Sequence, residues 1–210
     1  MQLFLQPVRD IFQTNAYFYI NEKNNHGCLI DPGAQASLLI QIANDHHWKI
    51  DEILLTHGHF DHSGAVDDLT QALDIPFYIH TRGPEYLQND ELNLAKGHNR
   101  HLNITQPPRL LKDGGELNLV KSGITFDIIY TPGHSFDSIT YFDAKNNLAF
   151  VGDVLYNDGP GIWQFPGGNK QQLRNTINQK IEKLPADTHF LVGHTGPMNM
   201  KQVQQSMLNF

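Results

Sequence analysis

Three histidines and an aspartate lie close together in the run Thr56-His57-Gly58-His59-Phe60-Asp61-His62. Neutral imidazoles are the commonest side-chain ligands of metal ions, and a turn that holds two of them, followed by an adjacent Asp and His, can face two metal positions. No packing requirement explains so many polar rings on one small turn. The run therefore predicts a site for two metals. For Asp61 alone there is a structural alternative, because an aspartate here could cap the helix that follows.

Three further residues with ligand chemistry follow small turn residues. His134 ends Thr131-Pro132-Gly133-His134, Asp153 follows Gly152, and His194 follows Gly193. A carboxylate can bridge two cations while offsetting their charge, which suits Asp153. Taken singly, the two histidines could be exposed loop residues and Asp153 a turn residue.

Each of these positions comes directly after an apolar segment that reads as a strand. The four segments are residues 53–55, 126–130, 148–151 and 190–192. In α/β architectures ligands gather beyond the carboxyl ends of the strands, so strands of similar direction would bring these positions to one edge. The predicted ligands are His57, His59, Asp61, His62, His134, Asp153 and His194.

The rest of the chain alternates strand and helix patterns in two successive blocks. Strands are expected at residues 2–6, 16–21 and 27–31, and strand texture returns between residues 109 and 151. Helical spacing of apolar residues predicts amphipathic helices at 38–43, 65–73 and 173–184, the last capped by Asn169. Asp113-Gly114-Gly115 and Asn146-Asn147 are expected to form hairpin turns.

Composition narrows the class of protein. The 210 residues, numbered 1–210, are expected to form a single domain, and their net charge of −7 argues against a nucleic-acid partner. The single cysteine, Cys28, excludes an internal disulfide framework and fits a core position in an apolar strand. No secretory signal or membrane-spanning run is evident, so we expect no membrane partner and a cytoplasmic location. The oligomeric state is left open.

With these motifs in place, the sequence resembles the metallo-β-lactamase superfamily, and within it the glyoxalase II-like (hydroxyacylglutathione hydrolase) branch. The resemblance rests on the segments Leu29-Ile30-Asp31-Pro32-Gly33, His57 to His62, Thr131 to His134, Gly152-Asp153-Val154-Leu155, Phe165-Pro166-Gly167-Gly168-Asn169 and Gly193-His194. It implies an α/β fold, the four-layer αββα sandwich of the metallo-β-lactamase fold. It also implies how the ligands divide: His57, His59 and His134 on one metal, Asp61, His62 and His194 on the second, and Asp153 on both. Asp31 matches a position that supports the site from behind.

Two departures from the family pattern bear on the substrate. The family commonly has Gly-Arg-x-Asp where this chain has Gly161-Ile162-Trp163-Gln164, so the usual charged pair is absent. The larger glyoxalase II enzymes also add a helical C-terminal region that helps to hold glutathione, and this chain ends soon after His194. Specificity for glutathione is therefore not carried over.

These ligands predict a hydrolase with two divalent metal ions, most simply Zn²⁺, with iron or manganese as alternatives. A hydroxide that bridges two cations would serve as the nucleophile, because metal binding lowers the pKa of water from 15.7 to roughly 7. Asp61 is the candidate for proton transfer to the leaving group. A thiolate leaving group needs little such help, so hydrolysis of a small-molecule thioester is the first expectation.

Other functions remain open on the same residues. A lactonase, a persulfide dioxygenase and a phosphodiesterase or nuclease are alternatives, as is a non-catalytic metal-binding module. The acidic charge disfavours a nuclease, and a dioxygenase would use one iron and leave part of the second ligand set without a role. A β-lactamase is disfavoured by the missing signal peptide.

The Gly- and Pro-rich residues 158–168 are expected to form a substrate-facing loop without strand or helix. They begin shortly after Asp153 and carry two large aromatic residues, Trp163 and Phe165. With Tyr156, these are the candidate substrate-binding residues. The alternative is that the aromatic rings pack onto the core.

Overall fold

The chain folds around two six-stranded sheets in a computed structural model that describes residues 1–207 and 210. The first sheet is ordered β1 (Gln2–Arg9), β2 (Gln13–Asn21), β3 (His26–Ile30), β4 (Lys49–Leu54), β5 (Phe77–His80), β6 (Arg109–Leu111). The second is ordered β14 (Met198–Asn199), β13 (His189–Val192), β10 (Leu148–Gly152), β9 (Ile139–Asp143), β8 (Ile124–Tyr130), β7 (Glu116–Leu119). A separate ribbon pairs β11 (Leu155–Tyr156) with β12 (Gly159–Pro160), so the Gly159–Pro160 part of the predicted loop is a short strand.

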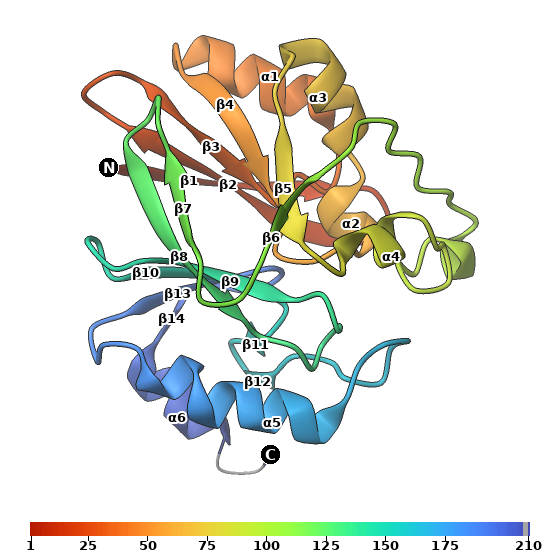
Figure 1. Cartoon of the computed structure of the whole chain (residues 1–210), viewed down its shortest axis with the longest axis vertical. Helices are drawn as coiled ribbons and strands as arrows, with labels where there is room; N and C mark the ends of the chain where they lie inside the picture. Colours follow the sequence, from red (N-terminus) through yellow and green to blue (C-terminus); the bar gives the residue numbers. More distant parts are fainter. Residues whose placement is uncertain (208–209) are drawn as a thin grey trace.

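Helices cover the outer face of each sheet, as Figure 1 shows. The first half of the chain contains α1 (Ala36–Asp45), α2 (Phe60–Ser63), α3 (Val66–Leu73), α4 (Gly83–Leu87) and the 3₁₀ helix η1 (Lys96–His98). The second half contains α5 (Lys170–Gln179), the 3₁₀ helix η2 (Ile181–Lys183) and α6 (Met200–Ser206). Helices α1 and α3 lie on the first sheet and α5 and α6 on the second, which gives the four-layer αββα sandwich expected from the sequence.

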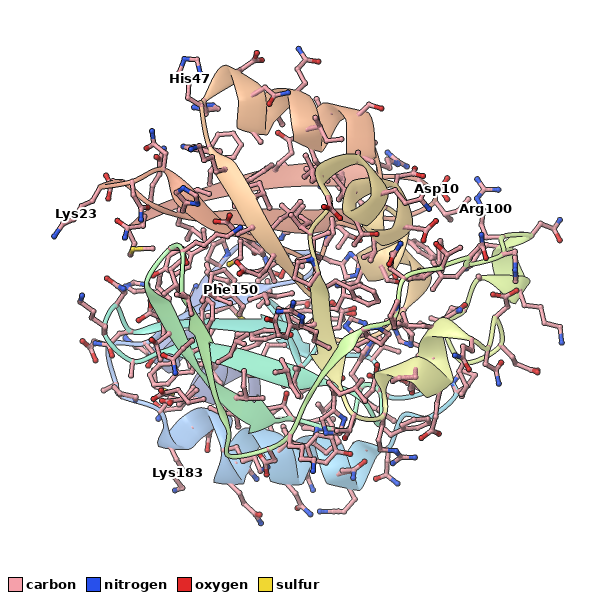
Figure 2. The ribbon with its side chains drawn as sticks, turned by 45° about the horizontal axis from the view of Figure 1, so that its top comes forward. Asp10, Lys23, His47, Arg100, Phe150 and Lys183 are labelled. Atoms are coloured by element: carbon pink, nitrogen blue, oxygen red, sulfur yellow. The ribbon has the colours of Figure 1, made fainter. Side chains whose placement is uncertain are left out.

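Successive side chains of a strand point to opposite faces of its sheet and so pack in different layers of the core. In β4 and the residue after it, Ile53 and Leu55 pack in the core beneath α1 and α3, whereas Leu54 points into the core between the two sheets. In β10, Phe150 lies in the core between the sheets (Figure 2), and its neighbours Ala149 and Val151 pack toward α5. Because both faces of these strands are buried, the segments read in sequence as continuous apolar runs.

One predicted turn is confirmed and one is wrong. Asn146-Asn147 joins the antiparallel strands β9 and β10, and Asn147 has a φ of 50°, in the left-handed region that such turns require. Asp113-Gly114-Gly115 is not a hairpin turn, because it leads from β6 in the first sheet to β7 in the second. Turn residues encode a change of direction, but not which sheet receives the next strand.

One predicted helix cap is also confirmed. Asn169 caps α5 as predicted, accepting a hydrogen bond from the backbone N–H of Gln172 at 2.9 Å. Within the described residues, no helix is long and apolar enough to cross a lipid bilayer.

Candidate metal centre

The four strands that end in predicted ligands deliver them to one place. Strands β8 and β10 each pair antiparallel with β9, and β13 pairs parallel with β10, so β8, β10 and β13 run in one direction. The run from His57 to His62 follows β4 of the first sheet. The seven predicted ligands gather where the two sheets meet, and six of them are at most 8% exposed: His57, His59, Asp61, His62, His134 and Asp153. His194 is partly exposed.

Three histidines form the first group. Nδ1 of His59 lies 3.1 Å from Nε2 of His57 and 3.0 Å from Nε2 of His134, which is 75 residues away in sequence. A neutral imidazole has one donor and one acceptor nitrogen, so one nitrogen that faces two others leaves at least one pair without a proper hydrogen bond. Three nitrogens directed at one point are the arrangement that a metal ion would satisfy.

His62, His194 and Asp61 form the second group. Nε2 of His62 and Nε2 of His194 are 3.3 Å apart, and Oδ2 of Asp61 lies 3.3 Å from Nε2 of His194. Asp153 lies between the two groups. Its Oδ1 is 3.3 Å from Nε2 of His62, and its Oδ2 is 3.6 Å from Nε2 of His134 and 3.1 Å from Nε2 of His194. One carboxylate is therefore within reach of both positions.

The outward-facing nitrogens of four histidines have partners that orient the rings. Nδ1 of His134 donates to the carbonyl of Ile162, and Nδ1 of His194 to that of Gln13, both at 2.6 Å. Nδ1 of His62 lies 3.0 Å from Oδ2 of Asp31, behind the cluster. Nδ1 of His57 contacts the Thr56 hydroxyl. Such partners fix the tautomer and direct the other nitrogen toward a metal.

The donor set fits two cations. Oδ1 of Asp153 is buried without a hydrogen-bond partner, although an unpaired buried polar atom is costly, and a cation beside it would satisfy it. Ligand atoms within 4.8 Å of one another occur in three groups: His57, His59 and His134; His57, His62 and Asp153; and Asp61, His62 and His194. His57 and His62 each belong to two groups, and Asp153 is in the group that joins them. The set therefore provides two adjacent positions with a shared carboxylate.

The charges of the two groups differ. Burial, reinforced by the neighbouring imidazoles, holds the pKa of His57 and His59 well below its ordinary value, and burial lowers the pKa of His134. Burial also opposes charge in the second group, but the carboxylates outweigh it and raise the pKa of His194 to about 10. The same interactions, against the effect of burial, lower the pKa of Asp61 to about 2. The first group thus offers neutral nitrogens, and the second is a cluster of ion pairs.

Two glycines make room for the shared carboxylate. A Cβ on Gly193 would overlap Oδ1 of Asp153 and approach the ring of His62 to 2.7 Å. Gly152 has a φ of 52°, and a Cβ there would overlap the Thr56 hydroxyl. The small residues that precede two of the predicted ligands are thus required by close approach and by backbone conformation.

A cavity of about 390 Å³ opens beside the cluster and is lined by two of the three predicted substrate-binding residues. Phe165 lies in its wall, with its ring centroid 6.0 Å from those of His59 and His134. Tyr156 also lines it and donates its hydroxyl to Oδ2 of Asp153 at 2.7 Å. Trp163, the third predicted substrate-binding residue, is not among the residues that line this cavity. Its ring packs on Phe210 with centroids 5.1 Å apart, as the alternative of core packing proposed.

The structure also corrects the alternative for Asp61 and adds residues that the sequence did not indicate. Asp61 lies inside α2, makes no capping hydrogen bond, and accepts one from the Thr14 hydroxyl at 3.2 Å. Asp137, buried, accepts a hydrogen bond from the backbone N–H of Gly58 at 2.8 Å and so fixes the turn between two histidines. Phe12 and Leu94 line the cavity from remote segments. Of these three residues, only Asp137 could have been linked to the site from sequence, because it lies close to His134 along the chain.

Comparison with known proteins agrees with this geometry. The family model for the metallo-β-lactamase superfamily matches residues 9–194, which include all seven residues of the cluster. The chain belongs to this superfamily. The fold and the family that the sequence motifs indicated are therefore confirmed, and the superfamily supports a metal-dependent hydrolase.

Several known proteins are similar to this chain over almost their whole length. A protein of Bacillus subtilis named "Probable metallo-hydrolase YqgX" is 38% identical over 91% of this chain and 88% of its own. "Hydroxyacylglutathione hydrolase GloC" of Haemophilus influenzae is 30% identical over 98% and 96%. The solved structure of BLEG-1, titled a B3 metallo-beta-lactamase, superposes with a TM-score of 0.90 at 33% identity and covers 96% of this chain and 95% of its own. TTHA1623 "in a di-iron-bound form" gives a TM-score of 0.86 at 27% identity, covering 99% and 100%.

Proposed function

We propose that this protein is a hydrolase with two divalent metal ions that cleaves small-molecule thioesters. The observation that carries the proposal is the convergence of seven ligand side chains, with an unpaired buried carboxylate oxygen on Asp153, beside an open cavity. His57, His59 and His134 would hold one ion, and Asp61, His62 and His194 the other. Asp153 would contact both.

The reaction is addition of water to the thioester carbonyl carbon, followed by cleavage of the C–S bond to give a carboxylate and a thiol. When bound, two cations supply a water of lowered pKa and polarisation of the carbonyl group. The protein supplies the rest: Asp153 offsets positive charge between the two positions, and the Tyr156 hydroxyl holds that carboxylate in place. Phe165 shields the first group of histidines from bulk water.

A protein nucleophile is not needed for this chemistry. Cys28 is fully buried between the sheets, and burial raises the pKa of its thiol well above the ordinary value. The Thr195 hydroxyl at the cavity accepts a hydrogen bond from the backbone of Asn157 at 2.9 Å and has no base that would activate it among its described contacts. Attack by water is therefore the mechanism that these residues favour.

The leaving group favours a thioester. A thiolate, with a pKa near 8.5 for cysteine, departs without protonation, whereas an amine must gain a proton. The similarity to the hydroxyacylglutathione hydrolase of Haemophilus influenzae supports the same class of substrate.

Hydrolysis of β-lactams is a second candidate because of one specific observation. The BLEG-1 structure, titled a B3 metallo-beta-lactamase, is 33% identical to this chain and superposes with a TM-score of 0.90. The identity of the native metal has two candidates as well, because the TTHA1623 structure is titled as a di-iron form. Zinc and iron loading therefore both belong in the test.

The test combines metal analysis with a substrate panel on one purified sample. Protein loaded with Zn²⁺ or Fe²⁺ is assayed with a thioester, a lactone, a phosphodiester and a β-lactam, and bound metal is counted by elemental analysis. We expect two ions per chain and the highest kcat/KM for the thioester. The His57→Ala variant should lose turnover, and an activity that survived without metal would refute the mechanism. A higher kcat/KM for the β-lactam would replace the thioester proposal with the second candidate.

A further inference from the structure

Apolar side chains form one wall of the cavity beside the metal cluster. Phe12, Leu94, Ile162 and Phe165 all line it. Phe12 is 42% exposed and Ile162 is 40% exposed, and they are two of the six large hydrophobic side chains that are exposed among the described residues. Grouped exposed apolar side chains at a cavity are typical of a ligand-binding surface.

The apolar wall continues into a second cavity of about 490 Å³. Phe12, Leu94 and Phe165 line both cavities, so these three side chains are a common boundary along which the two spaces adjoin. The outer side of the second cavity carries the ion pair between Lys96 and Glu91, with a nitrogen–oxygen distance of 3.6 Å and both side chains about 70% exposed. Apolar side chains therefore extend from the metal cluster toward solvent. We call these two adjoining cavities the apolar channel.

The residues that form the channel are held in place by contacts on both sides. Leu94 has a φ of 70°, a strained conformation for a residue that is not glycine. The preceding Asn93 is fully buried; its carbonyl accepts from the N–H of Phe60, and its side chain donates to the carbonyl of Tyr86 at 3.0 Å. Leu94 is thereby fixed to the segment that carries the ligands.

The turn that carries Phe12 is fixed by a paired arginine. Arg100 donates two hydrogen bonds of 2.8 Å to the carboxylate of Asp10, in the turn between β1 and β2 that presents Phe12. Figure 2 shows the two side chains next to each other at the edge of the molecule. The ring of Phe12 also meets that of His98 edge-on, with centroids 4.9 Å apart. The channel is therefore preorganised, which lowers the entropic cost of binding.

The charges at the cavity indicate which part of a substrate enters the channel. Its lining among the described residues includes the carboxylates of Asp61, Asp153 and Asp158 and no lysine or arginine. Thiol carriers with carboxylate or phosphate groups would find no lysine or arginine in this lining, whereas an alkyl chain would bury apolar surface.

We propose that the apolar channel binds the alkyl chain of an acyl thioester, with the scissile carbonyl at the metal cluster and the thiol portion directed to solvent. This inference rests on the proposed thioester hydrolysis and assigns the acyl group as the specificity-determining part. Phe12, Leu94 and Phe165 are the residues that select chain length. Each buried methylene should raise kcat/KM by roughly fourfold until the channel is filled.

The test uses the full chain loaded with two metals and two matched series of thioesters. The first series lengthens the acyl group from acetyl to octanoyl on one small neutral thiol, and the second lengthens the thiol with acetyl fixed. We expect kcat/KM to rise along the first series and to stay nearly flat along the second. Phe12→Ala and Leu94→Asn should each lower the octanoyl-to-acetyl ratio by about tenfold. Asparagine tolerates the left-handed backbone of Leu94, so this variant keeps the fold.

The matched control is Leu110→Ala, which truncates an exposed leucine on β6 that lines neither cavity and should leave the ratio unchanged. A flat acyl series, or a dependence on the length of the thiol instead, would overturn the acyl assignment while leaving thioester hydrolysis intact. If no thioester is cleaved, the proposed function fails, and calorimetry with acetate and octanoate decides the channel by itself. Tighter binding of octanoate that is lost in Phe12→Ala would support the channel, and equal affinities would refute it.

Discussion

Asp31→Asn should weaken metal binding although Asp31 is not one of the seven ligands. Its Oδ1 accepts the backbone N–H of Thr56 at 2.8 Å, and its Oδ2 accepts the Thr56 hydroxyl at 2.7 Å and faces Nδ1 of His62 at 3.0 Å. An asparagine has only one acceptor oxygen, so its NH₂ group must face donors. If the NH₂ group meets His62, the imidazole has to carry its proton on Nε2, the nitrogen that faces the metal position.

The magnitude follows from the role of this contact. Loss of a partner that orients a ligand typically costs 10- to 100-fold in metal affinity, or about 1.4 to 2.7 kcal/mol. The backbone should not be disturbed, because Asp31 has a φ of 51° and asparagine tolerates this left-handed region at least as well. We therefore expect a defect in the second metal position without unfolding.

The assay is competition with a chromophoric chelator, followed by elemental analysis at saturation. The matched control is Asp143→Asn, another buried carboxylate, which accepts the Tyr19 hydroxyl at 2.6 Å near the start of β10, the opposite end of that strand from Asp153. The control should lose stability and keep its affinity for metal. Wild-type affinity in Asp31→Asn, or an equal loss of affinity in both variants, would refute the reasoning.

Three further outcomes are expected. Asp153→Asn keeps the shape of the side chain but loses the charge between the two positions, so metal content and turnover should fall far more than the melting temperature; unchanged metal content would leave Asp153 a turn residue. Trp163→Ala should lower the free energy of unfolding by about 1 to 3 kcal/mol with KM unchanged, because the ring packs on Phe210, and a raised KM in a stable variant would return it to the pocket. His194, with its pKa raised to about 10, is protonated at pH 7 in the metal-free protein and must lose that proton to bind metal. Calorimetry in two buffers should therefore detect proton release, and apparent affinity should fall as pH is lowered; absence of proton release would contradict the charge assignment.

The clustering of the predicted metal ligands was accessible from sequence because their signal is local. A strand that is buried on both faces reads as an apolar run, and a ligand directly after it stands out against small turn residues, as with Asp153 after Gly152. The cap of α5 was equally local, since Asn169 and its partner Gln172 are three residues apart. Local patterns of this kind indicated the position of the cluster, and the resemblance to the superfamily that they carry implied the four layers.

Contacts between segments that are far apart in the chain could not be predicted from such local patterns. The turn at residues 113–115 shows that the chain changes direction, but which sheet receives β7 depends on packing that involves the whole chain. Trp163 and Phe165 are both large aromatic residues of the same Gly- and Pro-rich segment, so the sequence gives no reason to treat them differently. In the structure Trp163 packs on Phe210, whereas Phe165 lines the cavity. Phe12 and Leu94 lie in segments without a motif, so nothing in the sequence joined them to the site.

The metal cluster and the apolar wall are carried by different parts of the chain. The ligands follow the ends of buried strands, whereas Phe12, Leu94 and Ile162 come from a hairpin turn and two connecting segments. Substitutions on such segments alter a surface without disturbing the sheets that position the chemistry. The surface beside the metal cluster can therefore change through a few residues on connecting segments while the predicted ligands stay in place, and directed evolution of the protein has a small, defined set of positions from which to start.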